Sequence, residues 1–131
     1  MFKITPVQNQ ESADKILSAL NMDKKDGAFI YAMTDCETGA LMGASQFELS
    51  DEFGYIYDLK ETEGLNDFEA MFILGRQTMN FINQCGITVC RADLSAADEK
   101  LIKAIGFKKQ NEFYECDMTG FFDGSHCSGH K

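Results

Sequence analysis

The chain has 131 residues, 44% of them hydrophobic, which is enough to fill the core of a single domain. Its formal net charge is −9 and its 12 lysines and arginines are scattered, so nucleic acid is not expected as a partner. No apolar run approaches the roughly 20 residues of a membrane span, and the N-terminus lacks the apolar core of a signal peptide.

The five cysteines are an odd number. Four of them fall inside or beside predicted helices and strands, namely Cys36, Cys85, Cys90 and Cys116. This placement favours reduced thiols over a disulfide framework. We therefore expect a cytoplasmic protein.

Hydrophobic periodicity and turn residues define the elements of the first half of the chain. We expect a strand over residues 2–7, a helix over 12–20, and three strands over 28–34, 41–49 and 53–59. Gly39 supplies the permissive backbone for the turn between the second and third strands. In the last strand, Phe53, Tyr55, Tyr57 and Leu59 alternate and should share one face. This alternation favours core packing of the tyrosines over the alternative, in which they line a pocket.

The second half is predicted to contain two helices and two strands. A long helix over residues 67–84 carries Gly75 in its interior, which indicates close packing against a strand. A strand over 87–92 follows. Ser95 and Asp98 then have the spacing of a capping box at the start of a short helix. That helix ends at Gly106, beyond which Phe107 can fold back on the last turn, and a final strand lies within 112–118.

This order of elements, together with the segment Leu101-Ile-Lys-Ala-Ile-Gly-Phe107, resembles the GNAT N-acetyltransferase superfamily. The resemblance covers residues 2–118 and implies an α/β (α+β) domain, with 119–131 as a C-terminal tail. The implied sheet is mixed and mostly antiparallel, with helices on both faces. Its strands at 53–59 and 87–92 should be parallel neighbours that splay apart into a V-shaped cleft.

The resemblance implies transfer of an acyl group from acetyl-CoA to an amine. In the family, a glycine-rich loop at the start of the long helix holds the pyrophosphate, because free N–H groups at a helix N-terminus attract anions. The matching segment is 66–71, with Asn66, Phe68 and Ala70 as the binding positions. It contains no glycine and lies among carboxylates, which repel a diphosphate. We therefore expect a degenerate pyrophosphate loop and weak acetyl-CoA binding.

The resemblance also assigns the remaining cofactor contacts and the catalytic candidates. Tyr57, Asp58 and Leu59 lie on the strand edge that pairs with the pantetheine arm in the family, and Ser95 replaces a common asparagine. Glu61 is the candidate general base, with a solvated surface glutamate as the alternative. The family's tyrosine acid maps to Ile102, which cannot donate a proton. Tyr114 is a candidate replacement only if its strand turns that face toward the cleft.

Two other classes of function stay open beside the enzyme. One is a non-catalytic GNAT-like domain that binds another small ligand or a protein. The other is a homodimer subunit that associates through a strand edge and the pair Phe121 and Phe122, which otherwise anchor the tail to the domain. A phosphate-sized cleft at 66–71 would favour the enzyme, whereas a loop plugged by Phe68 would favour the non-catalytic domain.

The C-terminal tail carries His126, Cys127 and His130, which with Cys116 or Asp123 contain the ligand types of a zinc site. Their spacing matches no zinc signature. We therefore assign no metal to the chain, and the zinc site stays an alternative.

Overall fold

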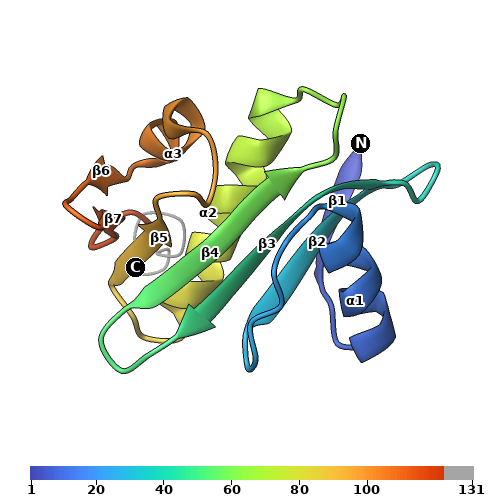
Figure 1. Ribbon diagram of the computed structural model, residues 1–131. Helices are drawn as coiled ribbons and strands as arrows, with labels where there is room; N and C mark the ends of the chain where they lie inside the picture. The colour runs from blue at the N-terminus through green and yellow to red at the C-terminus, as the bar shows by residue number, and fades with distance from the viewer. Residues whose placement is uncertain (123–131) are drawn as a thin grey trace.

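The computed structural model describes residues 1–122, so the predictions on Asp123, His126, Cys127 and His130 lie outside it. Seven strands form one sheet in the order β1-β2-β3-β4-β5-β7-β6 (Figure 1). The strands are β1 (Phe2–Pro6), β2 (Phe29–Asp35), β3 (Leu41–Leu49), β4 (Gly54–Glu61), β5 (Val89–Asp93), β6 (Lys108–Lys109) and β7 (Phe113–Asp117). The helices are α1 (Gln10–Ala19), α2 (Phe68–Gln84) and α3 (Glu99–Ile105).

The sheet is mixed and mostly antiparallel, as the sequence predicts. Strands β1 to β4 form an antiparallel meander, and the helix α2 crosses over to β5, which lies parallel to β4. The parallel ladder is short: it pairs Gly54, Tyr55 and Ile56 of β4 with Cys90, Arg91 and Ala92 of β5. Beyond Ile56 the two strands diverge. The predicted neighbours and their separation are therefore both confirmed.

Helices cover both faces of the sheet, which confirms the layer prediction (Figure 1). The helix α1 packs its Leu17 and the following Leu20 against Ile30 of β2 and Ala44 of β3. The opposite face carries the larger core, in which α2 and α3 pack against β3, β4, β5 and β7. Even-numbered residues of β3 around Ala44 therefore face α1, and odd-numbered ones face α2.

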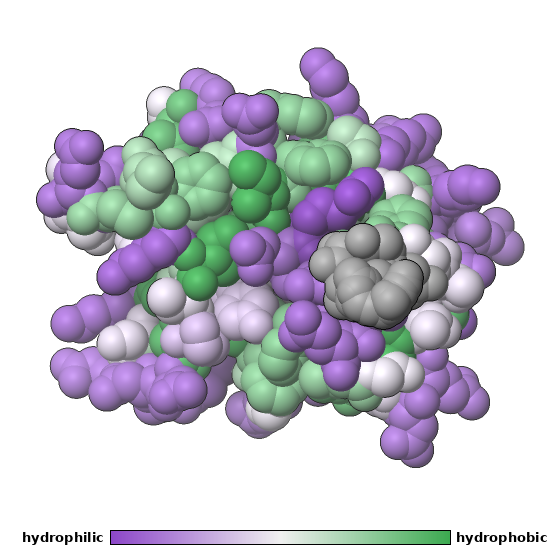
Figure 2. All heavy atoms as spheres, turned by 180° about the vertical axis from the view of Figure 1, so that it is seen from behind, coloured by the Kyte–Doolittle hydropathy of each residue, from purple (hydrophilic) through white to green (hydrophobic). Residues whose placement is uncertain are grey.

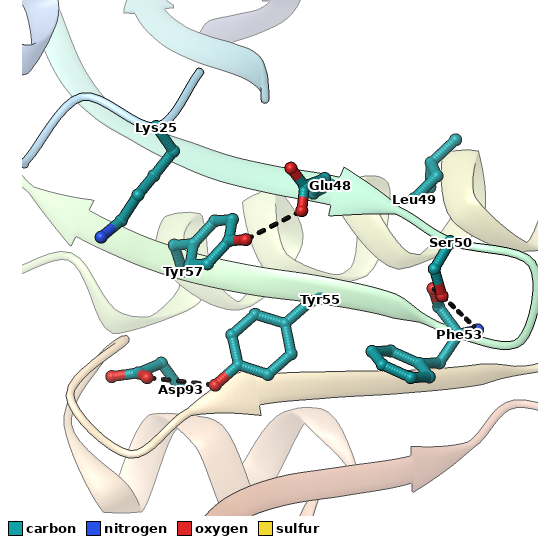
Figure 3. A pocket seen from close by; sticks show the side chains of 8 residues that line it. All are labelled: Lys25, Glu48, Leu49, Ser50, Phe53, Tyr55, Tyr57 and Asp93. Carbon is teal, nitrogen blue, oxygen red and sulfur yellow. Dashed lines mark hydrogen bonds between the residues drawn. The ribbon is translucent and has the colours of Figure 1, made fainter. Parts of the chain in front are cut away.

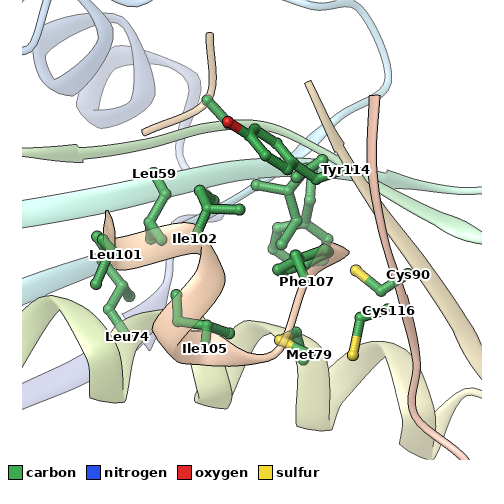
Figure 4. Close-up of a cluster of buried hydrophobic side chains, with 14 of the residues drawn as sticks. Leu59, Leu74, Met79, Cys90, Leu101, Ile102, Ile105, Phe107, Tyr114 and Cys116 are labelled. Carbon is green, nitrogen blue, oxygen red and sulfur yellow. The ribbon is translucent and has the colours of Figure 1, made fainter. Parts of the chain in front are cut away.

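The contact between α2 and α3 forms the centre of the larger core (Figure 4). Gly75 of α2 lies where a β-carbon would come within 2.5 Å of Ile105 Cδ1 and 3.3 Å of Leu59 Cδ2. The predicted close packing at Gly75 thus involves α3 as well as the strand β4. Met79, Ile82 and Ile102 are fully buried around this contact.

A β-bulge interrupts β4 and corrects the predicted alternation along this strand. Phe47 lies opposite Ile56 and Gln46 lies opposite Asp58, so Tyr57 is an extra residue without a partner on β3. As a result Leu59 faces α2 and is buried, whereas Tyr55 and Tyr57 face α1 and stay partly exposed. The bulge adds one residue and reverses the alternation from that point on.

The short helix α3 begins later than predicted. Its N-cap is Asp98, and Ser95 instead donates its backbone N–H and its hydroxyl to the Asp93 carboxylate. The predicted capping box between Ser95 and Asp98 is therefore wrong. The Asp93 carboxylate, only two residues before Ser95, takes the hydrogen bonds of Ser95. The predicted end is confirmed: Gly106 has a φ of 133°, and Phe107 is buried against the helix.

The face behind the sheet shows hydrophobic side chains between polar ones (Figure 2). Aromatic rings of β2 and β3 pack against one another and against Phe81 of α2, and the ring centres of these pairs are between 5.5 and 5.9 Å apart. At the C-terminal end, the Arg76 guanidinium lies 4.9 Å from the Phe121 ring centre, and Phe122 packs against the larger core.

Within residues 1–122, no helix is long and apolar enough to cross a membrane.

Candidate functional site

A pocket of about 420 Å³ opens on the α1 side of the sheet, over β4 between its turn with β3 and the end of β5 (Figure 3). Its walls carry two kinds of side chain, aromatic rings and charged groups. They are Tyr55, Tyr57 and Phe53, together with Glu48, Asp93 and Lys25, and the pocket is completed by Leu49 and Ser50. Alternation from Phe53 along β4 places the three rings on this face, and the bulge turns the following Asp58 to the same face, beside the pocket lining.

Hydrogen bonds to carboxylates fix both tyrosines. The Tyr55 hydroxyl donates to Asp93 Oδ1 at 3.0 Å, and the Tyr57 hydroxyl donates to Glu48 Oε1 at 2.9 Å. Burial, followed by the hydrogen bond to Asp93, raises the pKa of Tyr55 to about 12. Burial and the bond to Glu48 also raise the pKa of Tyr57. Both phenols therefore stay protonated at neutral pH and hold their rings in place.

Asp93 remains ionised in this environment. The Ser95 hydroxyl is the main cause that lowers the pKa of Asp93, and the Ser95 backbone N–H and the Tyr55 hydroxyl add to it. A pocket with two carboxylates and two tyrosine faces suits a cation, because ring faces and carboxylates both attract positive charge. The walls thus favour an amine over an anionic ligand.

The buried amide of Gln46 connects this pocket to Asp58. Gln46 is 1% exposed, and its Nε2 donates to Asp58 Oδ2 and to the backbone oxygen of Asp23, both at 2.9 Å. Its Oε1 accepts from the backbone N–H of Lys25 at 3.2 Å. Gln46 therefore fixes both the Asp58 carboxylate and the loop that carries Lys25.

Asp58 has the properties of a proton acceptor. Burial raises the pKa of its carboxyl group above the ordinary value, although Gln46, Lys60 and Lys25 act in the opposite direction. A higher pKa makes a carboxylate a stronger base. Sequence reasoning placed Asp58 in the cofactor contact, whereas its side chain faces the α1 side of the sheet, where Gln46 holds it next to the pocket lining.

The predicted pyrophosphate loop, at the other end of β4, is occupied by the chain's own carboxylates. Glu61 Oε2 accepts from the backbone N–H of Asp67 at 2.6 Å, and Asp67 Oδ1 accepts from the N–H of Ala70 at 3.0 Å. Two groups that would contact a diphosphate are thus satisfied internally, and the capping charges repel an anion. The residues at this end do not fit a diphosphate. The same contact gives Glu61 a structural role at the helix N-terminus, and its role as general base stays a prediction.

A second cavity, of about 250 Å³, lies beside this helix N-terminus. Asn66, Phe68 and Glu61 line it from one side, and Asp98 and Leu101 from the other. Phe68 does not plug it: the ring is 45% exposed, with the Lys100 ammonium 5.6 Å from its centre. Two of its lining residues are acidic, which again disfavours a phosphate.

The strand edge predicted to pair with pantetheine is partly closed. The Leu59 N–H donates to the Ala96 backbone oxygen at 2.8 Å, and Lys60 Nζ donates to the Ser95 backbone oxygen at 2.9 Å. Along β4, Leu59 lies between Tyr57, which lines the first cavity, and Glu61, which lines the second. After β5, Ala96 lies in the same way between Asp93 and Asp98. The loop before α3 therefore separates the two cavities.

Tyr114 lies away from both cavities. It is 4% exposed and belongs to the larger core, on β7 beside Ile102 and Phe107 (Figure 4). The condition attached to its catalytic role, that its face turn toward the cleft, is not met. Ser95 contacts the site indirectly, since it holds Asp93 in place.

Sequence reasoning missed the charged pocket residues and the amide behind them. Glu48, Asp93 and Lys25 line the pocket, and Gln46 lies next to it. They come from three separate segments, and their partners lie between 9 and 38 residues away along the chain. Gln46 carried the only usable signal, as a polar residue in the middle of an apolar strand. Among residues 1–122, no group of three or more His, Cys, Asp or Glu is arranged to hold a metal.

Solved structures of acetyltransferases have this fold. The ribosomal-protein-S18-alanine N-acetyltransferase of Escherichia coli superposes with a TM-score of 0.71 at 8% identity, over 90% of this chain and 94% of that one. IAA acetyltransferase of Bacillus cereus gives 0.70 at 12% identity, over 85% and 79%. A GNAT acetyltransferase of Elizabethkingia anophelis with acetyl-CoA bound gives 0.65 at 10% identity, over 88% and 97%.

Neither a protein-family model nor a curated protein sequence matches the chain. At these identities the structural likeness concerns the fold. The chain therefore has the GNAT fold, as its order of elements predicts.

Proposed function

We propose that the protein is an N-acyltransferase that uses acetyl-CoA or a related acyl-CoA as donor and a primary amine as acceptor. The observation that carries the proposal is the pocket of Tyr55, Tyr57, Glu48 and Asp93, which suits a cation and lies on the α1 side of the sheet beside the ladder of β4 and β5. The GNAT fold supports the reaction class, because structures with this fold include acetyltransferases with acetyl-CoA bound.

In this proposal the pocket holds the acceptor, and Asp58, which follows Tyr57 just outside the pocket lining, removes its proton. The amine enters as an ammonium and is held by the tyrosine rings and the two carboxylates. Asp58, with its raised pKa, accepts the proton that the nitrogen must lose before it can react. Acyl-CoA supplies a thioester: the nitrogen bonds to the acyl carbon and the carbon–sulfur bond breaks. The nitrogen then releases its second proton to water and the CoA thiolate takes up one proton from water, so the products are a neutral amide and CoA.

The donor should bind weakly, because this chain lacks the contacts that hold a diphosphate. Glu61 and Asp67 occupy N–H groups at the start of α2. We expect a Kd for acetyl-CoA poorer than micromolar. Glu61→Gln keeps a side-chain oxygen at the Asp67 N–H and removes one negative charge, so it should tighten acetyl-CoA binding. An unchanged Kd in calorimetry would show that charge at this end is not the cause.

A second candidate is a non-catalytic GNAT-fold domain that binds an amine. It is favoured by the hydrogen bond between the Leu59 N–H and the Ala96 oxygen, which closes part of the donor edge. In this alternative the loop before α3 stays closed and the amine pocket alone carries the function.

Turnover with acetyl-CoA separates the two candidates. The purified chain is incubated with millimolar acetyl-CoA and a panel of alkylamines, and product amide and CoA are quantified by mass spectrometry. The transferase predicts equal amounts of both products, and a loss of at least about 100-fold in kcat for Asp58→Asn. Absence of amide at saturating acetyl-CoA, with amine binding intact, would reject the transferase in favour of the second candidate.

A further inference from the structure

A cationic side chain of the protein already lies at the amine pocket. Lys25 comes from the loop between α1 and β2, and its Nζ is 5.2 Å from the centre of the Tyr57 ring (Figure 3). Its charge acts on Asp58 and on Asp93, and contributes to lowering the pKa of each. The ammonium of Lys25 thus stands among the groups to which we assign amine recognition.

The position of Lys25 is imposed by its backbone. Gln46 of β3 accepts a hydrogen bond from the Lys25 backbone N–H, donates one to the Asp23 backbone oxygen, and is itself buried. The neighbouring Lys24 points elsewhere: its Nζ lies 4.0 Å from Asp14 Oδ1 on α1. Only the side chain of Lys25 needs to rotate for another cation to reach Tyr57.

We infer that the pocket selects a primary ammonium at the end of an unbranched alkyl chain, and that Lys25 competes with this ligand for the same place. The inference rests on the amine site of the proposed function and names its ligand class. The aromatic faces of Tyr57 and Tyr55 would cover the alkyl chain, and Glu48 and Asp93 would attract the charge. Lys25 carries the same chemistry, since its side chain is four methylene groups that end in an ammonium.

The test is direct binding of n-butylammonium, followed by NMR of the tyrosine ring protons. Lys25→Ala should bind n-butylammonium about two- to fivefold more tightly than the wild type, which is the range that a cation over an exposed ring supports. Lys25→Gln should give the same direction and guards against a local effect of alanine. Lys24→Ala is the matched control, because it removes an equal charge one residue away, and it should leave the Kd unchanged.

Butanol has the same alkyl length without the charge. It should shift the tyrosine signals of neither the wild type nor Lys25→Ala. Equal Kd values for wild type and both Lys25 variants would overturn the competition, as would an equal gain in Lys24→Ala. Binding of butanol as strong as that of n-butylammonium would overturn the assigned ligand class. None of these measurements involves acetyl-CoA, so a failure of acyl transfer leaves the result interpretable.

Discussion

Asp58 combines a function that we assign with a cost to stability. Its carboxyl group is partly buried, and burial makes the charged form less favourable in the folded chain than in the unfolded one, although the hydrogen bond from Gln46 Nε2 acts in the opposite direction. The pKa in the folded state is therefore above the ordinary value of 3.8. For such an acid, stability is highest below the unfolded pKa and falls as pH rises through the folded pKa.

This sign gives a prediction for Asp58→Asn, which keeps an oxygen for the Gln46 amide and cannot ionise. The variant and the wild type should have similar melting temperatures near pH 3.5, and the variant should melt higher at pH 7. Scanning calorimetry at several pH values measures the gap. Asp51→Asn, at the exposed turn before β4, controls for the loss of one negative charge. A gap that is equal at both pH values would contradict the assigned pKa direction.

At the scale of single residues, the sequence predicted Tyr57 and Asp58 as site residues but not that both side chains lie on the same face of the sheet. Phe53, Tyr55, Tyr57 and Leu59 alternate without interruption, so nothing in the residue types marks the bulge. The bulge is decided by pairing with β3, which is a property of two strands. The link from Gln46 to Lys25 and Asp58 likewise spans distant segments and has no local pattern.

Sequence reasoning succeeded better for whole elements, because periodicity and turn residues are local. It placed β3 at its observed bounds and α2 within one residue. The start of α3 failed, since Ser95 fits a capping box equally well whether or not Asp93 takes its hydrogen bonds. The sequence predicted that Gly75 packs closely against another element. It did not identify Ile105 of α3 as the neighbour.

That neighbour gives a prediction about the contact between α2 and α3. Gly75→Ala gains up to about 1 kcal/mol of helix propensity, yet its methyl group would lie 2.5 Å from Ile105 Cδ1. Overpacking of a fully buried contact costs about 1–3 kcal/mol, so the free energy of unfolding should fall. Ile105→Val removes Cδ1. The double variant should therefore lose less free energy of unfolding than the two single variants lose in sum. Urea denaturation measures all three variants, and strict additivity would contradict the contact.

The whole sheet consists of two parts joined by a short seam. Strands β1 to β4 form one part and β5 to β7 the other, and between them runs the three-residue parallel ladder. The helix α2 contacts β3, β4 and β5 and therefore bridges the seam. The pocket lies over this ladder, because Tyr55 belongs to it and Asp93 follows it on β5, so the joint of the two parts is also the candidate site.

The net charge of −9 acts on both ligands that we propose, with opposite signs. Raising the ionic strength from about 20 to 200 mM shortens the Debye length from about 20 to 7 Å. Repulsion of acetyl-CoA is then screened and its Kd should fall, whereas attraction of n-butylammonium is screened and its Kd should rise. Calorimetry at the two salt concentrations measures both. A Kd for acetyl-CoA that rises with salt would instead reveal a basic donor site.

The extra residue in β4 has a consequence for the gene. Ile56 and Asp58 already lie opposite Phe47 and Gln46, so removal of Tyr57 would leave every other residue of the strand in its present register. An in-frame deletion of one codon would thus remove the bulge and one of the three rings of the pocket wall, while Phe53 and Tyr55 keep their places and the hydrophobic core is retained. A single mutational event can therefore reshape this pocket without disturbing the sheet that carries it.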